Sequence, residues 1–247
     1  MEVQLLIHLV FLGVILFQAL FILVQWMFFR RREYLFYIAY ILSIGLFVLF
    51  RVLSLNNPPL VDLPPWLQQI TYQPLGIFSY WMYLRFARTF LNLKMLQPKV
   101  YAWLKPLEIL LVSFIIACLL LVLLGVNIAD IKVPLLIYYI VMLLVCVPLF
   151  VVMLQQRNVL NNFLVLGCIC YVAGGFTGML LNYLWYGFES KTTAVFVGVE
   201  VGILAELLLL NTGFMLKNRI LAQQVEQAQQ EMEQQLLQEK QEKAGCH

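Results

Sequence analysis

The sequence predicts an all-α polytopic membrane protein, in which a bundle of seven transmembrane helices is followed by a C-terminal cytoplasmic helix. Hydrophobic residues make up 63% of the chain and charged residues only 12%, whereas a soluble domain carries about 25% charged residues. Seven apolar stretches are each long enough to cross roughly 30 Å of hydrocarbon as a helix. The composition changes abruptly after Leu216. We therefore expect a transmembrane domain at 1–216 and a cytoplasmic helical linker at 217–247.

Each predicted span is a run of about twenty or more mostly apolar residues. Lipid offers no partner to backbone N–H and C=O groups, so such runs are helices. The predicted spans are Val3–Phe29, Tyr34–Leu53, Trp66–Leu91, Trp103–Val126, Val133–Leu154, Phe163–Tyr186 and Thr193–Leu216. Pro74 and Pro148 fall inside the third and fifth spans, where proline kinks a helix.

The distribution of basic residues predicts the orientation of the bundle. With the N-terminus outside, thirteen of the sixteen Lys and Arg residues face the cytoplasm, and only Arg51, Lys132 and Lys191 lie outside. Such a bias is typical of membrane proteins, whose cytoplasmic loops are enriched in positive charge. Seven crossings then place the C-terminus inside.

The segment Lys217–Lys243 is rich in Gln and Glu and contains no Pro or Gly, which favours a helix. Its apolar residues follow the spacing of a coiled-coil seam. They are Leu221, Val225, Ala228 and Met232. The seam is weak, because its later positions, Gln235 and Glu239, are polar. Two interpretations remain open: a solvated helix that ends the chain, or a signalling helix that continues the seventh span and pairs with a second copy.

Two acidic residues, Glu200 and Glu206, lie in the seventh span. Charge inside a bilayer costs several kcal/mol unless it faces the bundle, pairs or is neutralised. Gly198, Gly202 and Glu206 recur every fourth residue and share one helix face, so we expect Glu206 to point at a neighbouring helix. Its role is either a buried hydrogen bond or a part in sensing or switching. Glu200 lies on a different face, which we expect to be closer to the outer water.

The sixth span has a matching set of small residues. Gly174 and Gly178 are four residues apart, and glycines at this spacing let a second helix approach closely. Because the sixth and seventh spans are joined by a short loop, we predict that they pack against each other through their glycine faces.

Three arginines lie near the ends of predicted spans. Arg51, at the outer end of the second span, either reaches the outer headgroups or pairs with Asp62 or an anionic ligand. Arg85 and Arg88 lie at the cytoplasmic end of the third span, where we expect them to meet anionic headgroups.

Several classes of function find no support in the sequence. Nucleophile motifs, phosphate-binding loops and metal-ligand spacings are absent, so we expect no enzyme activity, metal or cofactor. Four of the five cysteines fall inside apolar runs and are expected to be packing residues. A net charge of +3 gives no reason to expect a nucleic-acid partner. A receptor module is the first hypothesis. A small-molecule or ion transporter is the alternative, disfavoured by the few polar residues inside the spans.

Three local patterns resemble the membrane module of the bacterial seven-transmembrane receptors with diverse intracellular signalling modules. The first is the basic-then-aromatic junction Arg30–Tyr37, and the second is Arg85–Leu93, which closes the third span. The third is Glu206–Leu210 in the last span, running into Leu216–Ile220 and the Gln/Glu-rich helix. The resemblance covers nearly the whole chain.

The resemblance implies a receptor in the bacterial inner membrane that passes an outside signal, from an unknown ligand or protein, to a cytoplasmic output domain. In this family the output is commonly a histidine kinase, as in two-component systems, or a diguanylate cyclase. The 247 residues contain no such domain and no outer ligand-binding domain. Ligand and output are therefore not carried over, and only Glu206 transfers as a residue of interest. We expect a homodimer formed through the C-terminal helix.

Overall fold

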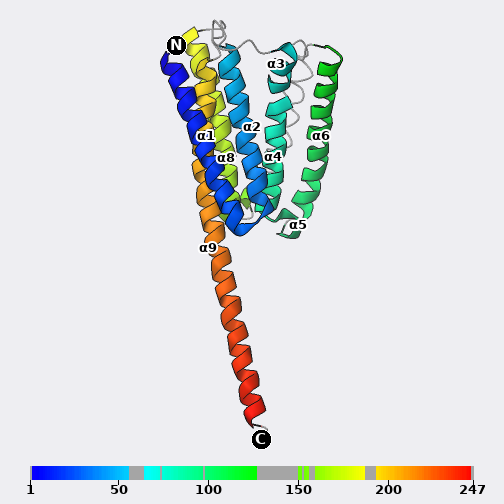
Figure 1. Cartoon of the computed structure of the whole chain (residues 1–247), viewed down its shortest axis with the longest axis vertical. Helices are drawn as coiled ribbons and strands as arrows, with labels where there is room; N and C mark the ends of the chain where they lie inside the picture. Colours follow the sequence, from blue (N-terminus) through cyan, green and yellow to red (C-terminus); the bar gives the residue numbers. More distant parts are fainter. Residues whose placement is uncertain are drawn as a thin grey trace. The chain divides into compact units, whose positions relative to one another are not determined.

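The computed structural model describes residues 2–55, 64–72, 74–96, 98–126, 150–151, 153–155, 159–186 and 193–245, which form helices and no strands (Figure 1). The helices are α1 (Glu2–Phe29), α2 (Arg32–Leu55), α3 (Pro65–Tyr72), α4 (Pro74–Phe90), α5 (Leu93–Leu96), α6 (Pro98–Leu123), α8 (Val159–Tyr186) and α9 (Thr193–Gly245). Five of these described helices, α1, α2, α6, α8 and α9, are long and apolar enough to cross a membrane. The predicted all-helical membrane class is thus confirmed.

The predicted third span, Trp66–Leu91, is helical on both sides of Gln73, which lies outside the described residues. Two helices cover it: α3 ends at Tyr72, and α4 begins at Pro74. Proline has no N–H to donate to the preceding turn. The kink expected at Pro74 stays a prediction, because the residue before it is outside the described part of the chain. Most of the predicted fifth span, with Pro148, lies outside the described residues.

The turn between α1 and α2 consists of Arg30 and Arg31. Arg30 has φ 51°, a left-handed conformation that costs a non-glycine residue about 1 kcal/mol or more. Two contacts offset that cost. The Arg30 N–H donates to the Trp26 carbonyl at 2.8 Å, which caps α1, and the guanidinium lies 5.1 Å from the centre of the Trp26 ring. The chain can therefore reverse within two residues.

By its internal contacts the chain divides into two units, 1–152 with 191–197, and 153–190 with 198–247. In the first unit, α1 packs on α2, α2 on α4, and α4 on α6 (Figure 1). Gly45 lets α1 and α2 approach closely, since a Cβ there would lie 2.7 Å from Ile15 Cγ2. Large apolar side chains on other faces, such as Phe17 and Phe28, are exposed, as expected of surfaces that meet lipid.

The second unit contains α8 and almost all of α9. The 53 residues of α9 correspond to about 80 Å of helix at 1.5 Å per residue. The part from Val197 to Leu216 is mostly apolar and partly buried, whereas Ala222–Gln238 is exposed throughout. In Figure 1, α9 continues well past the end of α8 as a single helix.

Candidate functional site

The closest contact in the second unit joins α8 and α9 through glycines. A Cβ at Gly174 would lie 2.5 Å from the Gly198 carbonyl oxygen and 2.7 Å from Gly202 Cα. A Cβ at Gly198 would lie 2.6 Å from Gly178 Cα. These neighbours are backbone atoms, which cannot move aside by changing rotamer. The four glycines singled out in the sequence therefore lie together, and they place two helix backbones in direct contact.

Glu206 lies on the same face of α9, two turns beyond Gly198. It is buried, and a Cβ at Gly167 of α8 would lie 3.2 Å from Glu206 Cγ. The methylene groups of Glu206 can therefore pack against α8 because residue 167 is a glycine and has no side chain. This glutamate packs against a helix.

Glu200 is as buried as Glu206, with 2% of its surface exposed. Its burial does not depend on its position along the helix, so the expectation that it lies nearer the outer water stays a prediction. Six residues separate the two glutamates, which places them on different faces of a helix with 3.6 residues per turn. More than one face of α9 is therefore covered at this depth.

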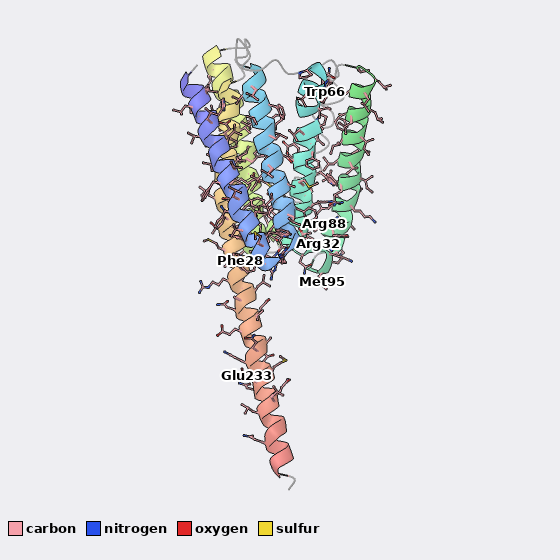
Figure 2. The ribbon with its side chains drawn as sticks, in the orientation of Figure 1. Phe28, Arg32, Trp66, Arg88, Met95 and Glu233 are labelled. Atoms are coloured by element: carbon pink, nitrogen blue, oxygen red, sulfur yellow. The ribbon has the colours of Figure 1, made fainter. Side chains whose placement is uncertain are left out.

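The predicted coiled-coil seam is mostly exposed, and it begins one heptad after the buried residue Phe214. Phe214 is buried, Leu221 is partly exposed, and Val225, Ala228 and Met232 are exposed. Figure 2 shows Glu233 on the same exposed part of α9. Arg51 lies within α2, but its side chain is outside the described part of the structure, as is Asp62.

The first unit contains an ion pair between two of its helices. Arg88 Nη1 of α4 donates to Glu108 Oε2 of α6 at 2.8 Å, and the two side chains are 20% and 10% exposed. Arg88 also lies over the Tyr101 ring at 5.2 Å. The expectation that Arg88 meets lipid headgroups is therefore wrong. The Glu108 carboxylate on α6 pairs with Arg88 instead of a headgroup phosphate, and this pairing lets the charge remain inside the bundle.

Arg85 is held by aromatic rings instead of an acid. Its guanidinium carbon lies 4.7 Å from the centre of the Trp81 ring, one turn earlier on α4, and 5.7 Å from that of Phe36 on α2. Behind it, a group of packed aromatic rings fills the contact between α2 and α4. The pairs are Tyr37–Phe86 and Tyr40–Tyr83, both at 4.9 Å, and Phe86–Phe90 at 5.2 Å.

Glu108 was missed in the sequence, although a signal existed. Glu108 is an acidic residue near the start of the predicted fourth span, and Arg88 lies near the end of the third. The two residues are therefore expected at about the same depth in the membrane. Matched depth on consecutive helices is the condition for an ion pair. Elsewhere in the described residues, no three His, Cys, Asp or Glu side chains are placed to share a metal ion.

The family model described as 7TM diverse intracellular signalling matches residues 4–217. The chain belongs to this family. The resemblance drawn from the three local patterns is thereby confirmed, and a member of the 7TM diverse intracellular signalling family is an integral membrane signalling module. No curated protein and no solved structure matches the chain.

The glycine contact of this family member can be tested with two adjacent residues. We expect Gly174→Ala to lower the stability of the bundle by about 1–3 kcal/mol, because the methyl group overlaps backbone atoms. Gly175→Ala is the matched control, since its Cβ would meet only Val199 Cγ2 at an ordinary 3.6 Å. The measurement is the thermal unfolding midpoint of each purified variant in detergent. Equal midpoints would contradict the close contact.

The Arg88–Glu108 pair can be tested by a double-mutant cycle. Arg88→Leu alone leaves a buried carboxylate unpaired and is expected to cost about 3–5 kcal/mol. Glu108→Leu alone leaves the arginine unpaired, whereas the double variant removes both charges and should recover most of the loss. Unfolding midpoints of the four proteins give the coupling energy. Additive losses would show that the pair contributes nothing.

Proposed function

We propose that this chain is a receptor module that carries a signal from the outer side of the membrane to a cytoplasmic output through α9. One observation carries the proposal: α9 is a single helix from Thr193 to Gly245. The same helix contributes Gly198 and Gly202 to the glycine contact and the exposed seam to the tail. A displacement at one end of an unbroken helix reaches the other end.

The orientation follows from charge. Thirteen of the sixteen basic residues fall on one side if the chain crosses the membrane seven times, and positive charge accumulates on the cytoplasmic side. The N-terminus is then outside and the tail inside, in the inner membrane of a bacterium by family resemblance. An outer ligand or protein is the source of the signal.

The moving contact in this mechanism is that between α8 and α9. Packed helices shift by sliding or rotation of about 1–2 Å. At Gly174 and Gly198 the two helices meet through backbone atoms, so at these two positions no side chain has to leave a hole on the facing helix. Glu206, one or two turns nearer the tail, packs over Gly167 and moves with α9.

The tail converts this movement into a change of pairing. Its seam is polar at later positions, so a dimer formed through it has low stability, and small movements of the helices above can shift it between packings. The output is a separate or following domain, a histidine kinase or diguanylate cyclase by family resemblance.

Cysteine crosslinking tests the paired tail. Single cysteines replacing Val225, Ala228 or Met232 are expected to form disulfide-linked dimers in membranes under mild oxidation, because seam residues of two helices face each other. The measurement is the dimer fraction on a non-reducing gel, with the other five cysteines replaced.

Gln223 and Gln230 provide the matched controls, since both are exposed residues on the opposite face of the same helix. We expect their cysteine variants to crosslink several-fold more slowly. Equal rates at all five positions, or no dimer at any of them, would refute pairing through the seam.

Glu206 can be assigned to a hydrogen bond or to a switch by two substitutions. Gln keeps the shape and hydrogen-bonding capacity of Glu, and Leu removes that capacity. If Glu206 is a buried hydrogen-bonding group, Glu206→Gln retains the wild-type unfolding midpoint and tail crosslinking, and Glu206→Leu loses about 1–3 kcal/mol. A Gln variant that folds normally but changes the crosslinking rate would instead assign Glu206 to switching.

A further inference from the structure

Arg85 is fixed in position but not neutralised. The Trp81 and Phe36 rings hold its guanidinium between two helices, at 4.7 and 5.7 Å. Cation–π contacts orient a guanidinium, but they leave its N–H groups without acceptors. Arg85 Nε is buried and has no hydrogen-bond partner in the part of the chain that the structure describes.

Trp81 adds a second donor beside the guanidinium. Its indole Nε1–H is likewise buried without an acceptor in the described structure. A buried donor that lacks an acceptor costs about 1–3 kcal/mol. Arg85 and Trp81 are in contact, and each has a donor without an acceptor. This indicates that an acceptor from outside the chain binds to the pair.

The surrounding charges leave a positive excess at the same place. Arg88 is neutralised by Glu108, and Arg31 lies 3.9 Å from Glu33. Among the described residues, neither Arg85 nor Arg32 has an acidic partner. Arg32 precedes Phe36 by one helical turn, about 6 Å, on the helix that supports Arg85. Figure 2 shows Arg32 at the same end of the first unit as Arg88.

We propose that Arg85, with Trp81 and Arg32, binds the phosphate group of an anionic phospholipid at the α2–α4 face. Guanidinium groups donate paired hydrogen bonds to phosphate oxygens, and the aromatic rings set the plane of this one in advance. The site is independent of the signalling role proposed above.

Exposed apolar side chains at the same end of the first unit favour a lipid over a soluble phosphate. Leu35 precedes Phe36 on α2 and is 41% exposed, and at the same end Phe28 and Met95 are each 80% exposed (Figure 2). A free phosphate makes no use of these apolar side chains. A phospholipid places its acyl chains against them while its headgroup meets the cations.

Lipid binding to the full chain in detergent tests the site. Native mass spectrometry would measure the apparent affinity for phosphatidylglycerol, with phosphatidylcholine as the uncharged-headgroup comparison. We expect Arg85→Gln to weaken phosphatidylglycerol binding about tenfold. Arg85→Lys keeps the charge but not the planar group, so its affinity for phosphatidylglycerol should fall less. Trp81→Phe keeps an aromatic ring but removes the indole N–H, so its affinity should also fall.

Lys94→Gln is the matched control, because it removes one exposed positive charge at the same end without disturbing an aromatic contact. It should weaken binding less than twofold. Equal losses in Arg85→Gln and Lys94→Gln, or equal affinity for both lipids, would overturn the proposal. Displacement of the lipid by millimolar sodium phosphate would overturn the assignment to a lipid. If Arg85→Gln does not fold, the lipid affinity of Arg85→Lys is compared with wild type instead. Its unfolding midpoint is measured alongside to show that the variant is folded.

Discussion

Every part of this structure depends on the rule that a backbone in hydrocarbon must satisfy its own hydrogen bonds. The rule makes helices of the apolar runs. The same hydrocarbon provides no hydrophobic force to bring those helices together, since lipid is as apolar as leucine. Helix association then depends on close packing and on a few polar contacts. The glycines of α8 and α9 supply the first, and the Arg88–Glu108 pair supplies the second.

The two arginines on α4 show how one helix manages two charges differently. Arg88 has a carboxylate 2.8 Å away on α6, which holds α4 and α6 in one register. Arg85, one turn earlier, has rings from α4 and α2. Together they connect three helices at one end of the first unit. The aromatic pairs between α2 and α4 fill the space behind them, so the charges rest on a rigid surface.

The long helices and their glycine faces were predictable because they depend on local sequence. Gly198 and Gly202 recur at helical spacing, and this alone defines a face. The pairing of Arg88 with Glu108 was missed because each residue was considered only with its own neighbours in sequence, although the two lie at similar depths in consecutive predicted spans.

The exposed half of α9 has a consequence for how such a receptor responds to its own abundance. A Gln-rich helix without tertiary support is only marginally stable in water, so its order depends on whether a second helix is near. Attachment to a bilayer confines both helices to a thin layer and raises their effective concentration. Under the proposed pairing, the tail would therefore report the local crowding of receptors in the membrane as well as the state of the bundle above it.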